Sequence, residues 1–162
     1  IRRLLVTGDA DRWDGVTESL LHFAARRDHL RRTVWPALRS GAWVVSDRFA
    51  DSTLAYQGVG HGVDMETLRR LYAIAVGDFA PDLTIVLDLP QTEGLARAGA
   101  RAASGAEDRY ERMGGDFHAR LRQAFLDIAA AEPGRCAVIA ASGDVDAVHA
   151  RVMAEVARRL SP

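Results

Sequence analysis

The stretch DRFADSTLAYQG, Asp47 to Gly58, directly follows a short apolar run, Ala42-Trp43-Val44-Val45-Ser46. The run is rich in β-branched and aromatic residues, which predicts a buried strand over residues 42–46. The stretch after it is crowded with hydrogen-bond donors and acceptors, which predicts a loop over residues 47–58. In an open parallel sheet, ligands bind outside the carboxyl ends of the strands. Residues 47–58 are therefore the first candidate for a functional site.

On both sides of this stretch, helix and strand patterns alternate. We expect the end of a helix at residues 1–6. Longer helices are expected at 18–40, 64–76, 90–98, 117–128 and 144–156, and two more strands at 83–88 and 136–140. Thr17, Asp64 and Asp144 are the expected N-caps of three of these helices, and Pro36 is expected to kink the first. The alternation predicts an α/β fold with a parallel sheet of right-handed βαβ units.

The composition narrows the class of protein. The length predicts one domain over residues 1–162. A net charge of −1 gives no reason to expect nucleic acid or a membrane surface as partner, and no apolar run is long enough for a membrane helix. The 21 basic side chains are all arginine, and the single cysteine, Cys136, allows no internal disulfide, which fits the cytoplasm.

Asp47 and Arg48 stand where the predicted strand ends. An arginine fork is the best side chain for binding a phosphate, and the aspartate could orient it or lie near a magnesium ion. The alternative is an ordinary ion pair at the start of a loop. The rest of the stretch favours the functional interpretation, because its hydroxyl, aromatic and amide groups suit a sugar and a base: Ser52, Thr53, Tyr56 and Gln57.

Residues 97–111 form a second basic segment, which we interpret as a lid. Arg97 and Arg101 share a helix face because they lie four residues apart, and Arg109 adds a third positive charge. Such a cluster could stabilise a transferring phosphoryl group. The alternative is a solvated helix whose arginines pair with nearby acidic residues.

In chain order, the segments IRRLL, LLHFAARRDHL with WPAL, VVSDRFADSTLAYQG, PDLTIVLDLP and EDRYE resemble thymidylate kinase, the nucleoside monophosphate kinase that phosphorylates dTMP from ATP. The resemblance implies a P-loop kinase fold, in which helices flank a parallel sheet. It also implies a cytoplasmic homodimer that uses dTMP, ATP and Mg²⁺ in dTTP biosynthesis, with no nucleic-acid or membrane partner.

The resemblance also implies roles for the residues of the central stretch. Arg48 would grip the dTMP phosphate, and Asp47 would lie beside the phosphates and Mg²⁺, with water between the carboxylate and the metal. Thr53 and Gln57 would lie near the base. Ser52 would support them, and Tyr56 would pack by the sugar and help to exclude a ribose 2′-hydroxyl.

Two further groups of residues match the family. Arg26 falls at the position of an arginine that hydrogen-bonds thymine. The family usually has a stacking phenylalanine four residues earlier, where this chain has His22 followed by Phe23, and either ring could stack. Arg97, Arg101 and Arg109 match a lid that carries catalytic arginine. Arg48, Arg97 and Arg101 would then be the catalytic residues.

The printed sequence departs from the family at its start, since neither the first strand nor the glycine-rich P-loop with its lysine precedes Ile1. We expect the intact protein to carry that stretch upstream and the 162 residues alone to be inactive. Two alternatives stay open: a related nucleotide kinase of other base preference, and a non-catalytic nucleotide-binding or dimerisation module that has lost its P-loop.

Overall fold

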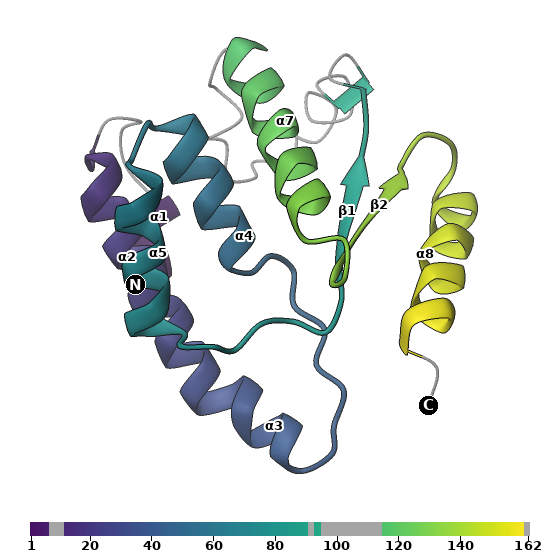
Figure 1. Ribbon diagram of the computed structural model, residues 1–162, viewed down its shortest axis with the longest axis horizontal. Helices are drawn as coiled ribbons and strands as arrows, with labels where there is room; N and C mark the ends of the chain where they lie inside the picture. Colours follow the sequence, from purple (N-terminus) through teal and green to yellow (C-terminus); the bar gives the residue numbers. More distant parts are fainter. Residues whose placement is uncertain (7–11, 91–92, 95–114, 161–162) are drawn as a thin grey trace. The chain divides into compact units, whose positions relative to one another are not determined.

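The computed structural model describes residues 1–6, 12–90, 93–94 and 115–160 (Figure 1). The contacts divide the chain into two compact units, Ile1–Phe79 and Ala80–Pro162, and each is described by itself. The single domain over 1–162 stays a prediction. The expected lid, 97–111, and most of the expected helix 90–98 lie outside the described residues.

The first unit is helical in its described part. It contains α1 (Arg2–Val6), α2 (Gly15–His29), the π-helix η1 (Leu30–Val34), α3 (Trp35–Arg39), α4 (Ala50–Thr53), the π-helix η2 (Leu54–Gly60) and α5 (Met65–Ala75). As expected, α5 is capped by Asp64, whose carboxylate accepts a 2.8 Å hydrogen bond from the Thr67 amide. The first residues are helical as expected, in α1, and its being the end of a longer helix stays a prediction.

The predicted helix 18–40 is present but differs in two details. Its N-cap is Asp14 and not Thr17, because the helix begins at Gly15 and Thr17 donates its own amide to Asp14 Oδ1 at 2.7 Å. The helix also passes through η1 shortly before Pro36. Proline has no N–H to donate and its ring crowds the preceding turn, so the wider π turn there is the local response.

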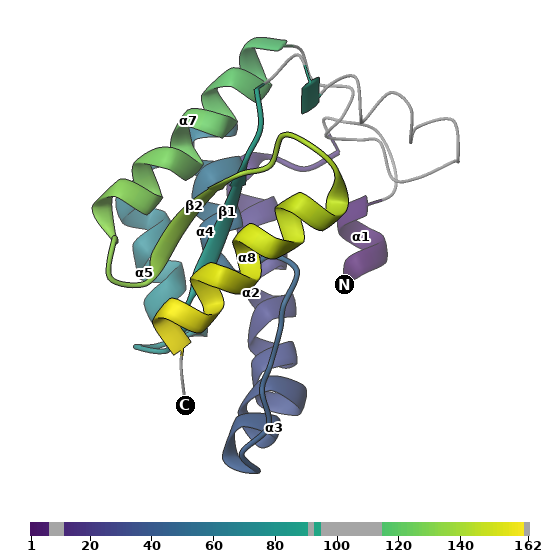
Figure 2. The same ribbon diagram turned by 90° about the vertical axis from the view of Figure 1, so that its right-hand side faces the viewer.

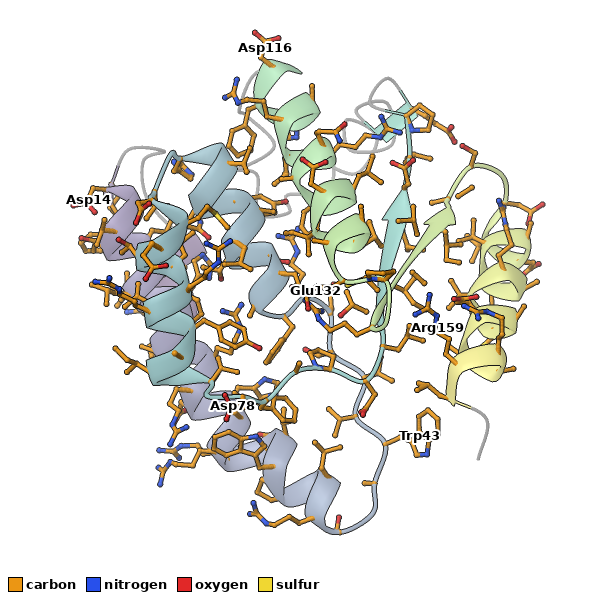
Figure 3. The ribbon with its side chains drawn as sticks, viewed as in Figure 1. Asp14, Trp43, Asp78, Asp116, Glu132 and Arg159 are labelled. Atoms are coloured by element: carbon orange, nitrogen blue, oxygen red, sulfur yellow. The ribbon has the colours of Figure 1, made fainter. Side chains whose placement is uncertain are left out.

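The predicted strand at 42–46 is wrong. A strand needs a hydrogen-bonded neighbour, and the sheet among the described residues holds only β1 and β2, which pair with each other. Residues 42–46 are irregular. Val45 is 95% exposed and Trp43, labelled in Figure 3, is 68% exposed. The apolar composition indicated burial, but composition alone supplies no pairing partner.

The predicted loop at 47–58 is wrong from Ala50 onward, where α4 and η2 follow one another. Ala50, Thr53 and Gln57 are all buried, and their spacing of three and four residues places them on one side of a helix. The polar side chains concealed this helical period, because two of the three buried positions carry polar groups.

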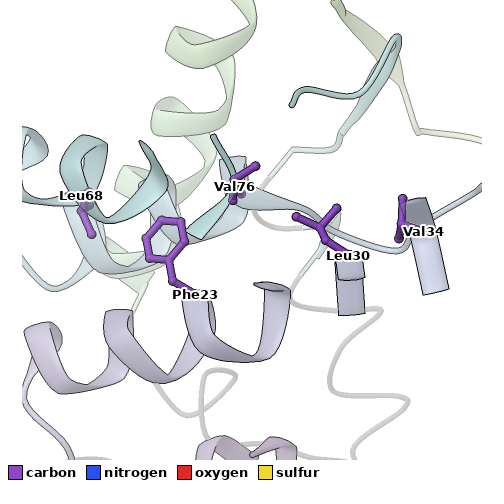
Figure 4. Close-up of a cluster of buried hydrophobic side chains, with 6 residues drawn as sticks. Phe23, Leu30, Val34, Leu68 and Val76 are labelled. Atoms are coloured by element: carbon purple, nitrogen blue, oxygen red, sulfur yellow. The ribbon is translucent and has the colours of Figure 1, made fainter. Parts of the chain in front are cut away.

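The core of the first unit joins α2, η1, α4 and α5 (Figure 4). Its fully buried side chains are Phe23, Leu30, Val34, Ala50, Leu68 and Val76. Around this cluster, the Tyr72 hydroxyl donates a 2.6 Å hydrogen bond to the Phe79 carbonyl, and the Tyr72 ring meets Phe23 edge-on at 6.4 Å. The core therefore fixes the helices that carry the candidate site.

The second unit has the predicted parallel pairing. Strand β1 (Thr84–Asp88) pairs with β2 (Cys136–Ala140), from Thr84 opposite Cys136 to Asp88 opposite Ala140. Helices α7 (Gly115–Ala131) and α8 (Val145–Leu160) lie on opposite sides of these strands (Figures 1 and 2). Asp144 caps α8 as expected, accepting from the Ala147 amide at 2.7 Å.

Two polar contacts hold the carboxyl ends of these strands. Arg122 of α7 donates from Nε and Nη2 to the Asp88 carboxylate, at 2.6 and 2.8 Å, and these hydrogen bonds lower the pKa of Asp88. The Ser142 hydroxyl donates to Glu93 at 3.0 Å. Among the described helices, none is long and apolar enough to cross a membrane.

Candidate functional site

The side chain of Arg26 joins two helices of the first unit. From the last turn of α2 its Nη1 donates to Thr53 Oγ1 on α4 at 3.0 Å, and its Nη2 donates to the Phe49 carbonyl, just before α4, at 2.8 Å. Two of its five N–H groups are used in this way. These contacts hold the Arg26 side chain against α4 and the residue before it.

Arg26 is also enclosed by aromatic rings. Its Cζ lies 5.4 Å from the ring centre of Phe23 and 5.4 Å from that of Phe49, within the range of cation–π attraction. Burial lowers the pKa of the Arg26 guanidinium to about 10, and the negative charge of Asp51 opposes that shift. The side chain therefore stays protonated at neutral pH and presents a fixed positive charge.

Gln57 brings an unsatisfied donor to the same unit. Its side chain is 1% exposed, and its Nε2 has no hydrogen-bond partner among the described residues. A buried donor without a partner costs about 1–3 kcal/mol, so native structures retain one only for a reason. A ligand acceptor at this position would satisfy it.

The backbone of Arg48 has an unusual conformation. Its φ is +70°, in the left-handed region that side chains other than glycine rarely adopt. Ser46 supports this turn, because its hydroxyl donates to the Arg48 carbonyl at 2.9 Å. The guanidinium lies over the Tyr56 ring, with Cζ 5.0 Å from the ring centre. Backbone strain of this kind concentrates at functional sites.

The two candidate stacking rings have different environments. Phe23 is 2% exposed and belongs to the core, where it packs against Tyr72. His22 is half-buried and is not part of that core cluster. The structure thus commits Phe23 to packing within the protein.

The other predicted site residues have simpler surroundings. Ser52 is half-buried and its amide donates to the Phe49 carbonyl at 3.2 Å, while Asp47 is exposed. The predicted lid residues Arg97, Arg101 and Arg109 lie outside the described residues.

Two residues of the site were not predicted from the sequence. Phe49 contributes its backbone carbonyl and its ring, and Asp51 is a buried carboxylate that acts electrostatically on Arg26. Every residue has a backbone carbonyl, so the sequence does not indicate that this one accepts a hydrogen bond from Arg26. Asp51 could not be singled out either, because its burial and its helical setting are known only from the structure.

A second buried contact ties the first turn of α2 to the end of η2. Glu18 is fully buried, and its Oε2 lies 3.8 Å from His61 Nε2. The close approach depends on Gly15, since a Cβ there would lie 2.6 Å from Cγ2 of Val63. This contact holds η2, and with it Tyr56 and Gln57, against the helix that carries Arg26.

The described residues do not form a magnesium site by themselves. They contain no group of three His, Cys, Asp or Glu side chains that could hold a metal ion. Mg²⁺ commonly binds through one or two carboxylates together with water and substrate phosphates, so Asp47 alone fits only as a minor contributor. We assign no step of the reaction to the metal.

Comparison with known proteins shows which family the chain is similar to. A family model described as thymidylate kinase matches residues 1–152. The thymidylate kinase of Caulobacter vibrioides is 51% identical over 160 residues, covering 99% of this chain and 76% of its own. That of Magnetococcus marinus is 50% identical over 159 residues, covering 98% and 75%.

A solved structure matches as well. The crystal structure of thymidylate kinase from Ehrlichia chaffeensis superposes with a TM-score of 0.73 at 30% identity, over 96% of this chain and 72% of that one. The parallel β1–β2 pair flanked by helices agrees with the α/β fold of that kinase. On the family model, the sequence relatives and the fold, this chain belongs to the thymidylate kinase family.

Proposed function

We propose that this chain acts as a thymidylate kinase, transferring a phosphoryl group from MgATP to dTMP to give dTDP, and that dTMP binds in the first unit around Arg26. The observation that carries the site assignment is the half-buried Arg26, fixed to Thr53, in the same helical unit as the unsatisfied Gln57 amide. Nucleotide binding would explain why the Arg26 guanidinium and the Gln57 amide lie here, because a nucleobase has acceptors for their hydrogen bonds.

Thymine presents two carbonyl oxygens and one N–H at its edge. The remaining N–H groups of Arg26 and the Nε2 of Gln57 would donate to those carbonyls, with Thr53 fixing the guanidinium. His22 would stack on the base, because Phe23 is occupied in the core. Cytosine carries an amine in place of one carbonyl, so the same donors would discriminate against dCMP.

The phosphate and sugar would lie toward the exposed end of the site. Arg48, held over the Tyr56 ring, would grip the dTMP phosphate, and Tyr56 would pack by the sugar. The lid residues Arg97, Arg101 and Arg109 would stabilise the transferring group. The protein's contribution is positioning and positive charge, and no general base is needed because the attacking phosphate is already anionic.

MgATP supplies the phosphoryl group, and Asp47 would lie near the phosphates. We further propose a cytoplasmic homodimer without nucleic-acid or membrane partners. The single cysteine, Cys136, allows no internal disulfide, which supports a reducing compartment. Sedimentation analysis tests the dimer.

A thermal-shift titration with dTMP, dUMP and dCMP tests the substrate. We expect dTMP to raise the melting temperature most, because, at equal concentration, the ligand that binds the folded state most tightly stabilises it most. A larger shift with dCMP or dUMP would instead favour the related kinase of other base preference, which the histidine at position 22 leaves open.

A measurement of turnover distinguishes the kinase from the non-catalytic nucleotide-binding module. ADP release is followed with MgATP and dTMP, using the full product of the gene. Release that depends on dTMP supports the kinase. Tight dTMP binding without any ADP release would favour a binding module.

A further inference from the structure

Phe49 is held in place both at its backbone and at its ring. Its carbonyl accepts a 2.8 Å hydrogen bond from Arg26 Nη2 and a 3.2 Å hydrogen bond from the Ser52 amide. Its ring lies under the Arg26 guanidinium, with 5.4 Å from Cζ to the ring centre, and meets the Phe79 ring edge-on at 5.9 Å. Arg26 therefore contacts Phe49 twice, once at the carbonyl and once at the ring.

The residue before Phe49 is Arg48, whose backbone is left-handed, with a φ of +70°. Its carbonyl accepts the Ser46 hydroxyl at 2.9 Å, so two successive carbonyls, those of residues 48 and 49, are each held by a side chain. A strained conformation persists only where its surroundings fix it. The peptide group between Arg48 and Phe49 is planar and rigid, so a displacement of Phe49 also displaces the backbone of Arg48.

We propose that Phe49 is a positioning residue that couples recognition of the base to binding of the phosphate. The proposal rests on the proposed function, in which Arg26 reads thymine and Arg48 grips the phosphate of dTMP. Arg26 fixes Phe49, and Phe49 together with Ser46 fixes the backbone that carries the Arg48 side chain. A change at Arg26 or Phe49 should therefore weaken binding of the phosphate in addition to any effect on the base.

The affinity of dTMP divided by that of thymidine measures the contribution of the phosphate, because the two ligands differ in that group alone. Both are titrated calorimetrically at pH 7 into the full product of the gene, as wild type, Arg48→Ala, Phe49→Leu and the double variant. We expect each single variant to lower the ratio on the order of tenfold, since a charged hydrogen-bonding group is lost or displaced. The double variant should fall no further than Arg48→Ala, because both changes act on the same contact.

Three more variants separate positioning from general damage. Phe49→Tyr retains the ring and should keep the ratio within about twofold of the wild type. Arg26→Lys keeps the charge but lacks the planar fork that reaches Thr53 and the Phe49 carbonyl together. It should also lower the ratio, and it keeps the proposal testable if Phe49→Leu fails to fold. Val76→Ala, in the buried core of the same unit, should reduce stability and leave the ratio unchanged.

The outcomes distinguish this proposal from the proposed function. If Arg48→Ala lowers the ratio but it stays at the wild-type value in folded Phe49→Leu or Arg26→Lys protein, the coupling is overturned and the phosphate site stands. An equal fall in Val76→Ala also overturns the coupling. If Arg48→Ala leaves the ratio unchanged, or the wild type does not bind dTMP, the proposed site itself fails and this proposal fails with it.

Discussion

The Nη1 of Arg26 on helix α2 lies 3.0 Å from Oγ1 of Thr53 on helix α4, across 27 residues of sequence. This contact fixes a half-buried cation at the junction of two helices. Packing of Phe23, Leu68 and their neighbours beneath it sets the positions of both helices. The candidate site therefore depends on the core of the first unit.

Replacing Thr53 by valine keeps the shape of the side chain and removes the hydroxyl. Arg26 Nη1 would lose its acceptor in a buried setting, so we expect the free energy of unfolding to fall by about 1–2 kcal/mol and dTMP binding to weaken. Urea denaturation and calorimetric titration measure the two effects. Thr33→Val, at an exposed position of η1, is the control, and equal losses in both variants would contradict the assigned contact.

Replacing Gln57 by leucine should separate stability from binding. The change removes a buried donor that has no partner in the described structure, so the protein without ligand should become more stable, by about 1 kcal/mol. Binding of dTMP should weaken at the same time. A variant that loses stability and retains its dTMP affinity would show that the amide serves the fold instead.

Replacing Leu68 by alanine tests the core beneath the site. Leu68 is fully buried in the cluster of Figure 4, and we expect a loss of about 2–5 kcal/mol in the free energy of unfolding. Ile74 lies on the same helix and is 80% exposed, so Ile74→Ala should change it by no more than about 0.5 kcal/mol. Similar losses in the two variants would mean that the core is wrongly placed.

Glu155 on α8 predicts a pH dependence of stability. Hydrogen bonds from Arg158 and Arg159 lower its pKa from 4.5 to about 2. A carboxyl group whose pKa is lower in the folded state than in the unfolded state stabilises the fold at pH values above its unfolded-state pKa. This contribution disappears as the pH falls through the folded-state pKa. The wild type should therefore be more stable than Glu155→Gln at pH 7, and the gap should close between pH 4.5 and 2. Urea denaturation across that range, with Glu66→Gln as control, checks it, and a gap that persists at pH 2 would contradict the assignment.

Periodic, locally determined features were predictable from the sequence. Interactions within a few residues determine the apolar spacing of α7 and α8 and the caps Asp64 and Asp144. Continuous apolar runs indicate the parallel strands at residues 84–88 and 136–140. The family could be predicted as well, because several segments of the sequence resemble those of the family and follow one another in the same order.

Features that depend on distant partners were not predictable. The run at 42–46 has strand composition, but pairing is decided by a neighbouring strand and not by the run itself. The helical nature of α4 and η2 was concealed because Thr53 and Gln57 occupy buried positions with polar groups. The electrostatic effect of Asp51 on Arg26 likewise depends on residues far apart in the sequence.

Hydrogen–deuterium exchange with and without dTMP tests the central claim most directly, because it locates the bound nucleotide on the chain. If dTMP binds around Arg26, exchange should slow in residues 19–29, which carry Arg26, and in residues 49–60, which begin directly after Arg48 and carry Gln57. Saturating dTMP that leaves both segments unchanged, or slows exchange only in residues 115–160, would contradict this account.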